Sequence, residues 1–387
     1  MLTVGDVVAA LERRYPPQWA EGWDAVGLTC GDPDAPVERV LFAVDPAPVV
    51  VAEAREWNAD LLVTHHPLLL SGVHSVAATT PKGRVVHDLV RHDVALFSAH
   101  TNADSADPGV SDALASALGL AGLRPLKPMV EALDKVVVFV PHADAQRVLD
   151  ALASAGAGRI GDYDRCGYLL AGTGTFRPLA GANPTIGTVG EVEQVPETRL
   201  EMVLPRDRRD AVVAALRAAH PYEEPAFDVV ELAGFDSRRG LGRVGQLPEP
   251  ETFEDLVGRV AAAIPATVAG VQAGGDPERV VQTVAVCGGA GDSLLDAAAR
   301  SGADAFVTAD LRHHPAVEAL DGGGPALVNV SHWASEWPWL ASASEALALD
   351  LGDGGRALQM RVSEVCTDPW TMHAESLSDD LLEADDA

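Results

Sequence analysis

The stretch that decides the fold is VNVSHWASEW, residues 328–337, together with its echo LFSAHTNADS earlier in the chain. In each stretch an apolar run typical of a β-strand leads to a histidine, and an acid follows four residues later. The pairs are His332 with Glu336 and His100 with Asp104. A histidine and a carboxylate at this spacing lie on one face if the segment is helical. The repeated spacing therefore predicts two matching strand ends, each with a histidine and an acid.

The echo extends upstream of both pairs. NADLLVTHHP (58–67) aligns with GADAFVTADL (302–311), and both contain Ala-Asp, an apolar stretch and a threonine. After the threonine the first copy has His65 and His66, whereas the second has Asp310 at the position of His66. We interpret the two copies as related half-domains that differ where metal ligands would lie. Nitrogen and carboxylate donors at matching strand ends predict a single metal site between the halves.

The order of expected elements predicts an α/β fold. Strands such as 60–66 and 94–100 alternate with helices such as 83–93, which is typical of βαβ units and a mainly parallel sheet. From about Lys127 the pattern changes to a strand, a turn and a helix, twice, which favours a ferredoxin-like module inserted into the first domain. The expected domains are a discontinuous metal-binding α/β domain at 1–127 and 245–374, an α+β insert at 128–244, and an acidic disordered tail at 375–387.

Composition restricts the class of protein. A chain of 387 residues predicts more than one domain. The formal net charge of −29 argues against binding to DNA or RNA backbones, which requires clustered Lys and Arg. We expect no signal peptide and no membrane-spanning segment, and hence a cytoplasmic protein. The cysteines are widely spaced, as expected for unpaired residues in a reducing compartment: Cys30, Cys166, Cys287 and Cys366.

Five residues are candidate metal ligands, and they combine imidazole with carboxylate groups. They are His65, His66, Asp104, His332 and Glu336. This mixture suits Zn, Mn, Fe or Co rather than a metal that selects thiolates. Because adjacent imidazoles do not easily chelate one ion, His65 and His66 are expected to bind different ions of a pair. The competing interpretations are a polar loop for His65 and His66, and an ordinary surface ion pair for His332 and Glu336.

His100 is the candidate catalytic residue, although several roles stay open. It is a candidate third imidazole ligand, a donor that orients a ligand, a proton shuttle, or a buried histidine bonded to backbone. Asp310 is a candidate for the same cavity because it aligns with His66. His313 and His314 open an expected helix and are candidates to cap the pocket, with a solvated helix start as the default.

Two further motifs have simple structural explanations beside functional ones. CGGAGDSLL (287–295) resembles a phosphate cradle but lacks the P-loop lysine, and a tight strand-to-helix turn explains it. HPYEEPAFDV (220–229) is a candidate to reach the metal site from the insert, or a turn before a strand. The tryptophans Trp333, Trp337 and Trp339 are expected to wall the cavity or an interface.

Six short motifs together resemble those of a known family. In chain order they are WDAVGL, THHPLLLSG, SAHTNAD, GGAGDSLL, VTAD and SHWASE. They look like the motifs of the NIF-three-like dinuclear metal-centre proteins, also known as GTP cyclohydrolase I type 2 homologues. GTGTF, GANPTIG and HPYEEPAFDV, followed by GLGRVG, resemble the CutA/PII-like insert of the longer bacterial members. SHWASE departs from the pattern, since many members have Gly before this histidine and Tyr after it.

The resemblance implies a toroidal homohexamer with two divalent ions per chain, held by the five candidate ligands and facing an internal cavity. The first hypothesis for its function is a metal-dependent hydrolase acting on a small molecule. With GTP as substrate, an ion-activated hydroxide would attack C8 of the purine and open its imidazole ring, with His100 as acid or base. Phosphoester hydrolysis is a second enzymatic possibility. The competing class is a non-catalytic metal-binding or scaffold hexamer with a regulatory PII-like insert.

Overall fold

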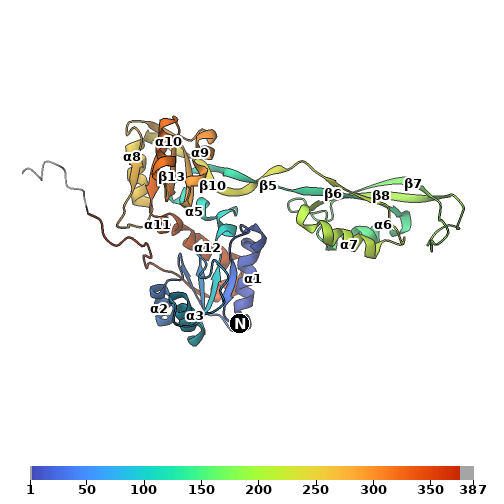
Figure 1. The fold of residues 1–387 in the computed structure, drawn as a ribbon, viewed down its shortest axis with the longest axis horizontal. Coiled ribbons are helices and arrows are strands. Elements are labelled where there is room, and N and C mark those ends of the chain that lie inside the picture. The colour runs from blue at the N-terminus through green and yellow to red at the C-terminus, as the bar shows by residue number, and fades with distance from the viewer. Residues whose placement is uncertain (1, 375–387) are drawn as a thin grey trace, which may run out of the picture. The chain divides into compact units, whose positions relative to one another are not determined.

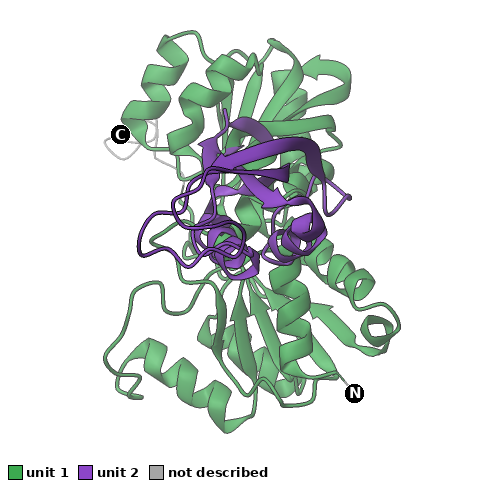
Figure 2. Ribbon diagram, turned by 90° about the vertical axis from the view of Figure 1, so that its right-hand side faces the viewer, with its two compact units in different colours: residues 1–129, 238–387 green, residues 130–237 purple. Residues whose placement is uncertain are grey.

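The computed structural model describes residues 2–374, so the tail predicted to be disordered, 375–387, lies outside the described residues. The chain forms two compact units, of which the first is discontinuous (Figure 2). The first unit comprises residues 1–129 and 238–387, and the second comprises residues 130–237. Segments from both sides of the second unit therefore fold together in the first.

The first sheet of the discontinuous unit is built around short, buried apolar strands. Its order is β1-β4-β3-β2-β15, with β1 antiparallel to β4 and all other neighbours parallel. The strands are β1 Gly27–Cys30, β2 Arg39–Ala43, β3 Leu61–Thr64, β4 Ala95–Ser98 and β15 Gln359–Val362. Its helices are α1 Val4–Arg14, α2 Pro48–Glu56 and α3 Pro81–Arg91 (Figure 1). Every residue of β3 is buried, as expected for a parallel strand covered on both faces.

The second sheet of this unit has the order β11-β14-β13-β12-β10-β5. Here β12, β13 and β14 are parallel, whereas β10 and β11 pair antiparallel with their neighbours β12 and β14. The strands are β5 Ala121–Glu131, β10 Phe235–Thr252, β11 Gln272–Gly274, β12 Val280–Ala290, β13 Ala305–Ala309 and β14 Ala326–Val330. Its helices are α8 Phe253–Ala263, α9 Leu295–Ser301 and α10 His313–Asp321 (Figure 1).

The two sheets share one hydrophobic core, which brings their strand ends together. Val63 and Phe97 from the first sheet belong to the same buried cluster as Val307 and Val328 from the second, with Trp339 among them. Two short helices begin just after β4 and β14, namely α4 Thr101–Asp104 and α11 His332–Glu336. The longer helices α5 Val110–Ala117 and α12 Pro338–Asp350 follow them, and the short helix α13 Asp353–Ala357 comes after α12. Carboxyl ends of parallel strands are where open α/β sheets bind ligands.

The second unit is an antiparallel sheet with two helices. Its elements follow in the order β6 Leu133–Pro141, α6 Ala145–Ser154, β7 Gly167–Phe176, β8 Glu193–Pro205, α7 Arg209–Ala219 and β9 Phe227–Glu231. The sheet order is β7-β8-β6-β9, and all its pairs are antiparallel. Apolar residues of α6 and α7 pack on those of β6 and β8 in a separate core. The unit therefore has its own hydrophobic interior.

Together the sheets confirm the predicted α/β class at a coarse level. Four short 3-10 helices complete the assigned helices of residues 2–374: Pro17–Trp19, His142–Asp144, Arg206–Arg208 and Asp292–Leu294. Across these residues, each helix is either too short or too polar to cross a lipid bilayer.

Candidate metal centre

His65 and His66 follow directly after β3, and hydrogen bonds hold both rings through Nδ1. His65 Nδ1 lies 2.9 Å from the carbonyl oxygen of Ala99, and His66 Nδ1 lies 2.7 Å from Oδ1 of Asp45. Because each Nδ1–H donates to an oxygen, Nε2 is left as the atom that can bind a metal. The two ring centroids are 5.0 Å apart. The strand end therefore brings adjacent imidazoles close together, as the sequence predicted.

His332 and Glu336 lie on α11, which begins after β14. Ser331 caps this helix by accepting a hydrogen bond from the backbone N–H of Ala334. His332 Nε2 lies 2.9 Å from Oε1 of Glu336, and its Nδ1 lies 2.7 Å from Oδ2 of Asp310. The predicted pair at this spacing is therefore formed, and Asp310 orients the ring of His332.

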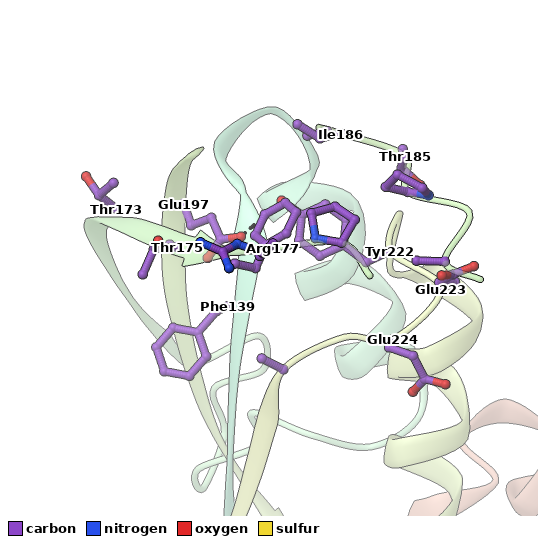
Figure 3. A pocket seen from close by; sticks show the side chains of 16 residues that line it. Phe139, Thr173, Thr175, Arg177, Thr185, Ile186, Glu197, Tyr222, Glu223 and Glu224 are labelled. Carbon is purple, nitrogen blue, oxygen red and sulfur yellow. Dashed lines mark hydrogen bonds between the residues drawn. The ribbon is translucent and has the colours of Figure 1, made fainter. Parts of the chain in front are cut away.

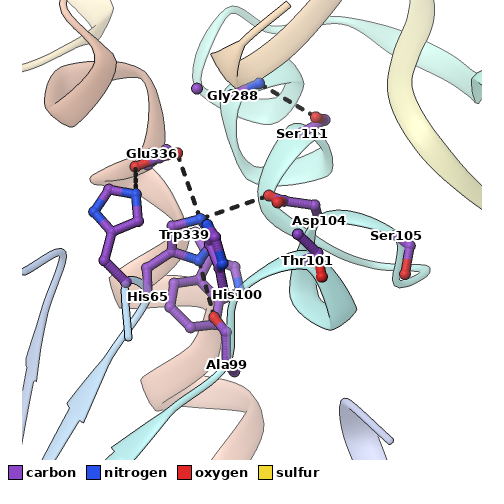
Figure 4. A network of polar contacts seen from close by, with 12 residues as sticks. His65, Ala99, His100, Thr101, Asp104, Ser105, Ser111, Gly288, Glu336 and Trp339 are labelled. Atoms are coloured by element: carbon purple, nitrogen blue, oxygen red, sulfur yellow. Dashed lines mark hydrogen bonds and ion pairs between the residues drawn. The ribbon is translucent and has the colours of Figure 1, made fainter. Parts of the chain in front are cut away.

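Glu336 is the residue on which the imidazoles converge. Its side chain is only 3% exposed, and its carboxylate lies 3.4 Å from His65 Nε2 and 3.1 Å from His66 Nε2. Figure 4 shows Glu336 and Asp104 facing the ring of His65 from different helices. Asp104 is 3.6 Å from His65 Nε2, with a side chain that is 22% exposed. Donors from both sheets of the discontinuous unit thus meet in one place.

His100 is held by a buried acid that the sequence analysis did not identify. Its Nδ1 lies 2.8 Å from Oδ1 of Asp24, whose side chain is fully buried. Asp24 also accepts hydrogen bonds from the backbone N–H and the hydroxyl of Thr101. The ring of His100 lies 5.2 Å from that of His65 and 5.4 Å from that of His66, centroid to centroid. His100 is therefore an oriented imidazole at the edge of the cluster.

The arrangement fits a divalent metal. Among the described residues, ligand atoms gather in two groups that share His66, within 4.8 Å of one another in each group. The groups are His65, His66 and His100, and His66, His332 and Glu336. Moreover, Nε2 of His65 and Oε2 of Glu336 are buried and make no hydrogen bond. Because buried polar atoms are rarely left without partners, these two fit the role of ligands to a cation.

Without metal, the cluster is held together by charges. Burial lowers the pKa of His66, but Glu336 and Asp45 outweigh this effect and raise it to about 11. Burial also lowers the pKa of His332, which Glu336 and Asp310 nevertheless raise to about 9. Burial raises the pKa of Glu336, yet the neighbouring imidazolium groups bring it well below its usual value.

The pKa values of Asp104 and His100 shift in a different way from those of the central groups. Burial raises the pKa of the Asp104 carboxyl to about 6. Burial and the charge of His65 lower the pKa of His100, although Asp24 opposes this shift. A neutral His100 therefore stands beside imidazoles that a metal would have to deprotonate.

The surroundings of the cluster include buried tryptophans and a pocket. Trp339 is 1% exposed, and its ring lies 5.3 Å from that of His65. Trp333 is also buried. A pocket of about 340 Å³ is lined by His332 and Asp310 on one side and by Trp370 on another. This pocket therefore borders the His332 side of the centre.

The remaining predicted candidates do not belong to the ligand groups of the described residues. His313 and His314 begin α10 and contact each other, but neither belongs to the ligand groups found among residues 2–374. In the glycine-rich turn, a Cβ on Gly289 would lie 2.5 Å from Oε1 of Glu336 and 3.2 Å from Nε2 of His332. Gly289 therefore makes room for the cluster. HPYEEPAFDV falls within the second unit, where the side chain of His220 bonds to the carbonyl of Phe139.

Sequence reasoning missed the acids that orient two of the imidazoles. Asp24 and Asp45 each bond to a histidine Nδ1, although neither lies near its partner in the chain. Asp24 lies within WDAVGL, shortly before β1, and Asp45 lies two residues after the end of β2, so closeness to a strand end was the available signal.

The fold and the site together define a class: an α/β protein with imidazole and carboxylate donors gathered at the carboxyl ends of parallel strands. The chain belongs to the Duf34/NIF3 (NGG1p interacting factor 3) family, whose profile matches residues 2–369. The resemblance found in the motifs is therefore confirmed.

Relatives match along nearly the whole chain. A protein of Mycobacterium tuberculosis called "GTP cyclohydrolase 1 type 2 homolog" is 52% identical over 96% of this chain and 98% of its own length. A Bacillus subtilis protein with the same name is 37% identical over 94% of this chain and 97% of its own. The crystal structure of a Bacillus cereus protein related to NIF3 matches with a TM-score of 0.77 and 34% identity, covering 96% of this chain and 99% of that one.

Proposed function

We propose that this chain is a metal-dependent hydrolase that works with two divalent ions. The observation that carries the proposal is the convergence of three imidazole Nε2 atoms within 3.4 Å of the Glu336 carboxylate. Two buried ligand atoms there make no hydrogen bond, which is the state expected of a centre that binds cations.

The proposed ligands are the five predicted residues, His65, His66, Asp104, His332 and Glu336. Imidazole and carboxylate donors accept Zn, Mn, Fe or Co. When bound, the ions would lower the pKa of a water molecule and stabilise negative charge that develops on the substrate. Asp45 and Asp310 would hold the rings of His66 and His332 in the orientation that presents Nε2.

His100 is the proposed proton acceptor and donor. Its Nδ1–H is engaged by Asp24, so a neutral ring keeps the lone pair on Nε2 available. Asp24 would also stabilise the imidazolium that forms when His100 takes a proton. Burial and its neighbours lower the pKa of His100, which favours the neutral base at pH 7.

The proposed substrate is a purine nucleotide such as GTP. The pocket beside His332 is large enough for part of a nucleotide, and the 68% exposed Trp370 on its wall offers a face on which a purine can stack. Relatives called GTP cyclohydrolase 1 type 2 homologs support this choice. Attack of one water at C8 would open the imidazole ring of the purine to a formamide, and a second water would hydrolyse that formamide and release C8 as formate.

The test is turnover by metal-loaded protein. Purified chain, stripped and reloaded separately with Zn, Mn, Fe or Co, should consume GTP and release formate. Replacing His100→Gln should lower the rate by about 10²–10⁴-fold, as for loss of a general acid or base, while metal content stays unchanged. The matched control is Glu345→Gln, an exposed acid on α12 that contacts no residue of the centre.

Two results would redirect the proposal. If every metal-loaded form binds its ions yet leaves GTP intact, the chain is a metal-binding scaffold rather than this hydrolase. If GTP is consumed without formate but with release of phosphate, the centre is a phosphoesterase.

We further propose an architecture for the family member. The matching strand ends of the two sheets would derive from duplication, and the second unit, with its β-α-β-β-α-β order, would be a CutA/PII-like insert.

The chain would assemble as a homohexamer in the reducing cytoplasm, where its four free cysteines are stable. Exposed apolar residues on β7, Tyr168, Leu169 and Leu170, support burial of that strand in an assembly. Size-exclusion chromatography with light scattering tests the hexamer, and a stable monomer contradicts it.

A further inference from the structure

The second unit contains a pocket that the proposed hydrolase does not use. It has a volume of about 440 Å³ and lies among β6, β7, β8 and the loops beside them (Figure 3). Phe139, Phe176 and Tyr222 supply aromatic surface, and the ring centroids of Phe176 and Tyr222 are 5.6 Å apart. The size and the aromatic walls are those of a small-molecule site.

A buried carboxylate stands among these rings. Glu197 on β8 is 8% exposed, and one of its oxygens, Oε1, accepts a hydrogen bond of 3.0 Å from the hydroxyl of Tyr222. Within the part of the chain that the structure describes, no hydrogen bond or ion pair is made by the other oxygen, Oε2. Unlike the unpartnered atoms of the metal centre, this oxygen keeps some contact with solvent, and a largely buried carboxylate gains from a further donor at such an oxygen. The free oxygen therefore points to a ligand that donates hydrogen bonds.

The strand opposite leaves space for this carboxylate. A Cβ on Gly174 would lie 2.0 Å from Oε2 of Glu197, so any larger residue in this place on β7 would displace the acid. Tyr222 remains a donor because burial and Glu197 raise the pKa of its hydroxyl. Tyr222 thus holds Glu197 through one carboxylate oxygen, and Gly174 leaves space for the other.

The charge of the lining favours a cation. Three acids line the pocket, Glu197, Glu223 and Glu224, against a single base, Arg177, which makes no ion pair with any described residue. One oxygen of Glu223 accepts a hydrogen bond from the backbone N–H of Asn183, so this acid also orders the loop above the pocket. Aromatic faces attract cations, most strongly where water is excluded. A neutral or anionic ligand would add no positive charge beside the buried carboxylate.

We propose that this pocket binds an organic cation, a protonated amine carried on an aromatic or aliphatic body, with its ammonium group at Oε2 of Glu197. The body of the ligand lies against Phe139, Phe176 and Tyr222. The site is independent of the metal centre, since all its residues belong to the second unit.

The probe is 2-phenylethylammonium, compared with the neutral 2-phenylethanol of nearly the same shape. Isothermal titration of the full chain should give an affinity for the amine at least about tenfold above that for the alcohol, the ratio expected of one charge-assisted contact. Glu197→Gln keeps an acceptor for Tyr222 but loses the charge, so it should make the two affinities equal. The matched control is Glu191→Gln, an exposed acid of the second unit outside the pocket lining, which should keep the preference for the amine.

Two further variants separate this site from the metal centre and from misfolding. Glu336→Gln should retain amine binding, because that acid belongs to the first unit. Gly174→Ala should weaken binding of both probes by displacing Glu197, while its unfolding midpoint reports whether the unit still folds. Equal affinity of the native chain for amine and alcohol would overturn the proposal, as would amine binding that disappears with Glu336→Gln or the absence of binding by either probe.

Discussion

The two strand ends that supply the candidate metal centre share a sequence spacing but differ in their surroundings. After β4, His100 donates through Nδ1 to Asp24; after β14, His332 donates through Nδ1 to Asp310. The carboxylate of Asp24 is fully buried, whereas that of Asp310 is 56% exposed and lines a pocket. The acid that orients the imidazole is therefore shielded from solvent in one sheet and exposed beside a pocket in the other.

The acids four residues later differ as well. Glu336 pairs with His332 on its own helix and also faces both histidines of the other sheet. Asp104, one methylene shorter, faces only His65, at 3.6 Å. Spacing alone thus creates a histidine and an acid at each strand end, while side-chain length and local space decide which acid becomes the centre of the cluster.

The largest effect is expected from neutralising the central acid. Glu336→Gln should abolish binding of both ions, because each proposed ion has this carboxylate as a ligand, whereas Asp104→Asn should weaken only the ion at His65. Elemental analysis of reloaded protein measures both, with Glu345→Gln as the exposed control. Equal loss of metal in the two variants would contradict the different roles assigned to Glu336 and Asp104.

Next in size is the loss of the acids that orient the rings. Asp24→Asn should reduce turnover by about 10- to 100-fold with metal content unchanged, because it disturbs a proton-transfer residue. Asp310→Asn should instead lower metal affinity by a similar factor through His332. Competition with a chromophoric chelator measures affinity, and formate release measures turnover. Reversed outcomes would exchange the roles assigned to the two ends.

Much of this centre could be predicted from the sequence, because its donors lie at strand ends and repeat at a fixed spacing. His65, His66, His332 and Glu336 needed only the pattern and the rule for parallel sheets. Asp24 and Asp45 could not be assigned, since hydrogen bonds between distant segments depend on how the strands meet. For the same reason the sequence left the role of His100 open. Its bond to Asp24 favours the role of a proton shuttle.

Proton competition provides a smaller, graded effect. The pKa values of His66, about 11, and His332, about 9, mean that both rings are protonated at pH 7 without metal. Metal affinity should therefore rise with pH, by about tenfold per unit for each proton displaced. Calorimetry in buffers of different ionisation enthalpy measures the released protons. Affinity that is independent of pH between 6 and 8 would contradict protonated imidazoles in the metal-free centre.

The same shifts predict the opposite trend for metal-free stability. Because the pKa of His332 is raised in the folded state, its stabilising contribution is complete below the value of a free imidazole, ~6.5, and is lost as the pH rises through 9. Denaturant titrations with a chelator present should show this decline. If the metal-loaded protein, titrated without chelator, loses the same stability over this pH range, the ions do not replace the proton on His332.

The smallest effect concerns the space around Glu336. Gly289→Ala and Gly302→Ala both place a side chain at positive φ, +68° and +76°, and each should cost about 1 kcal/mol or more of stability. Only the first also meets the cluster, because a Cβ on Gly302 has nothing within 4 Å. Gly289→Ala should therefore lose metal affinity in addition, as measured by chelator competition. Equal metal affinity in both variants would show that Gly289 serves only the turn.

The central claim is that donors from both sheets hold the same ions, and anomalous X-ray scattering from crystals of the reloaded protein tests it most directly. The account predicts two anomalous peaks, both within bonding distance of Glu336, one shared with His65 and the other with His66 and His332. Peaks whose ligands all come from one sheet, or no peak beside Glu336, would contradict it.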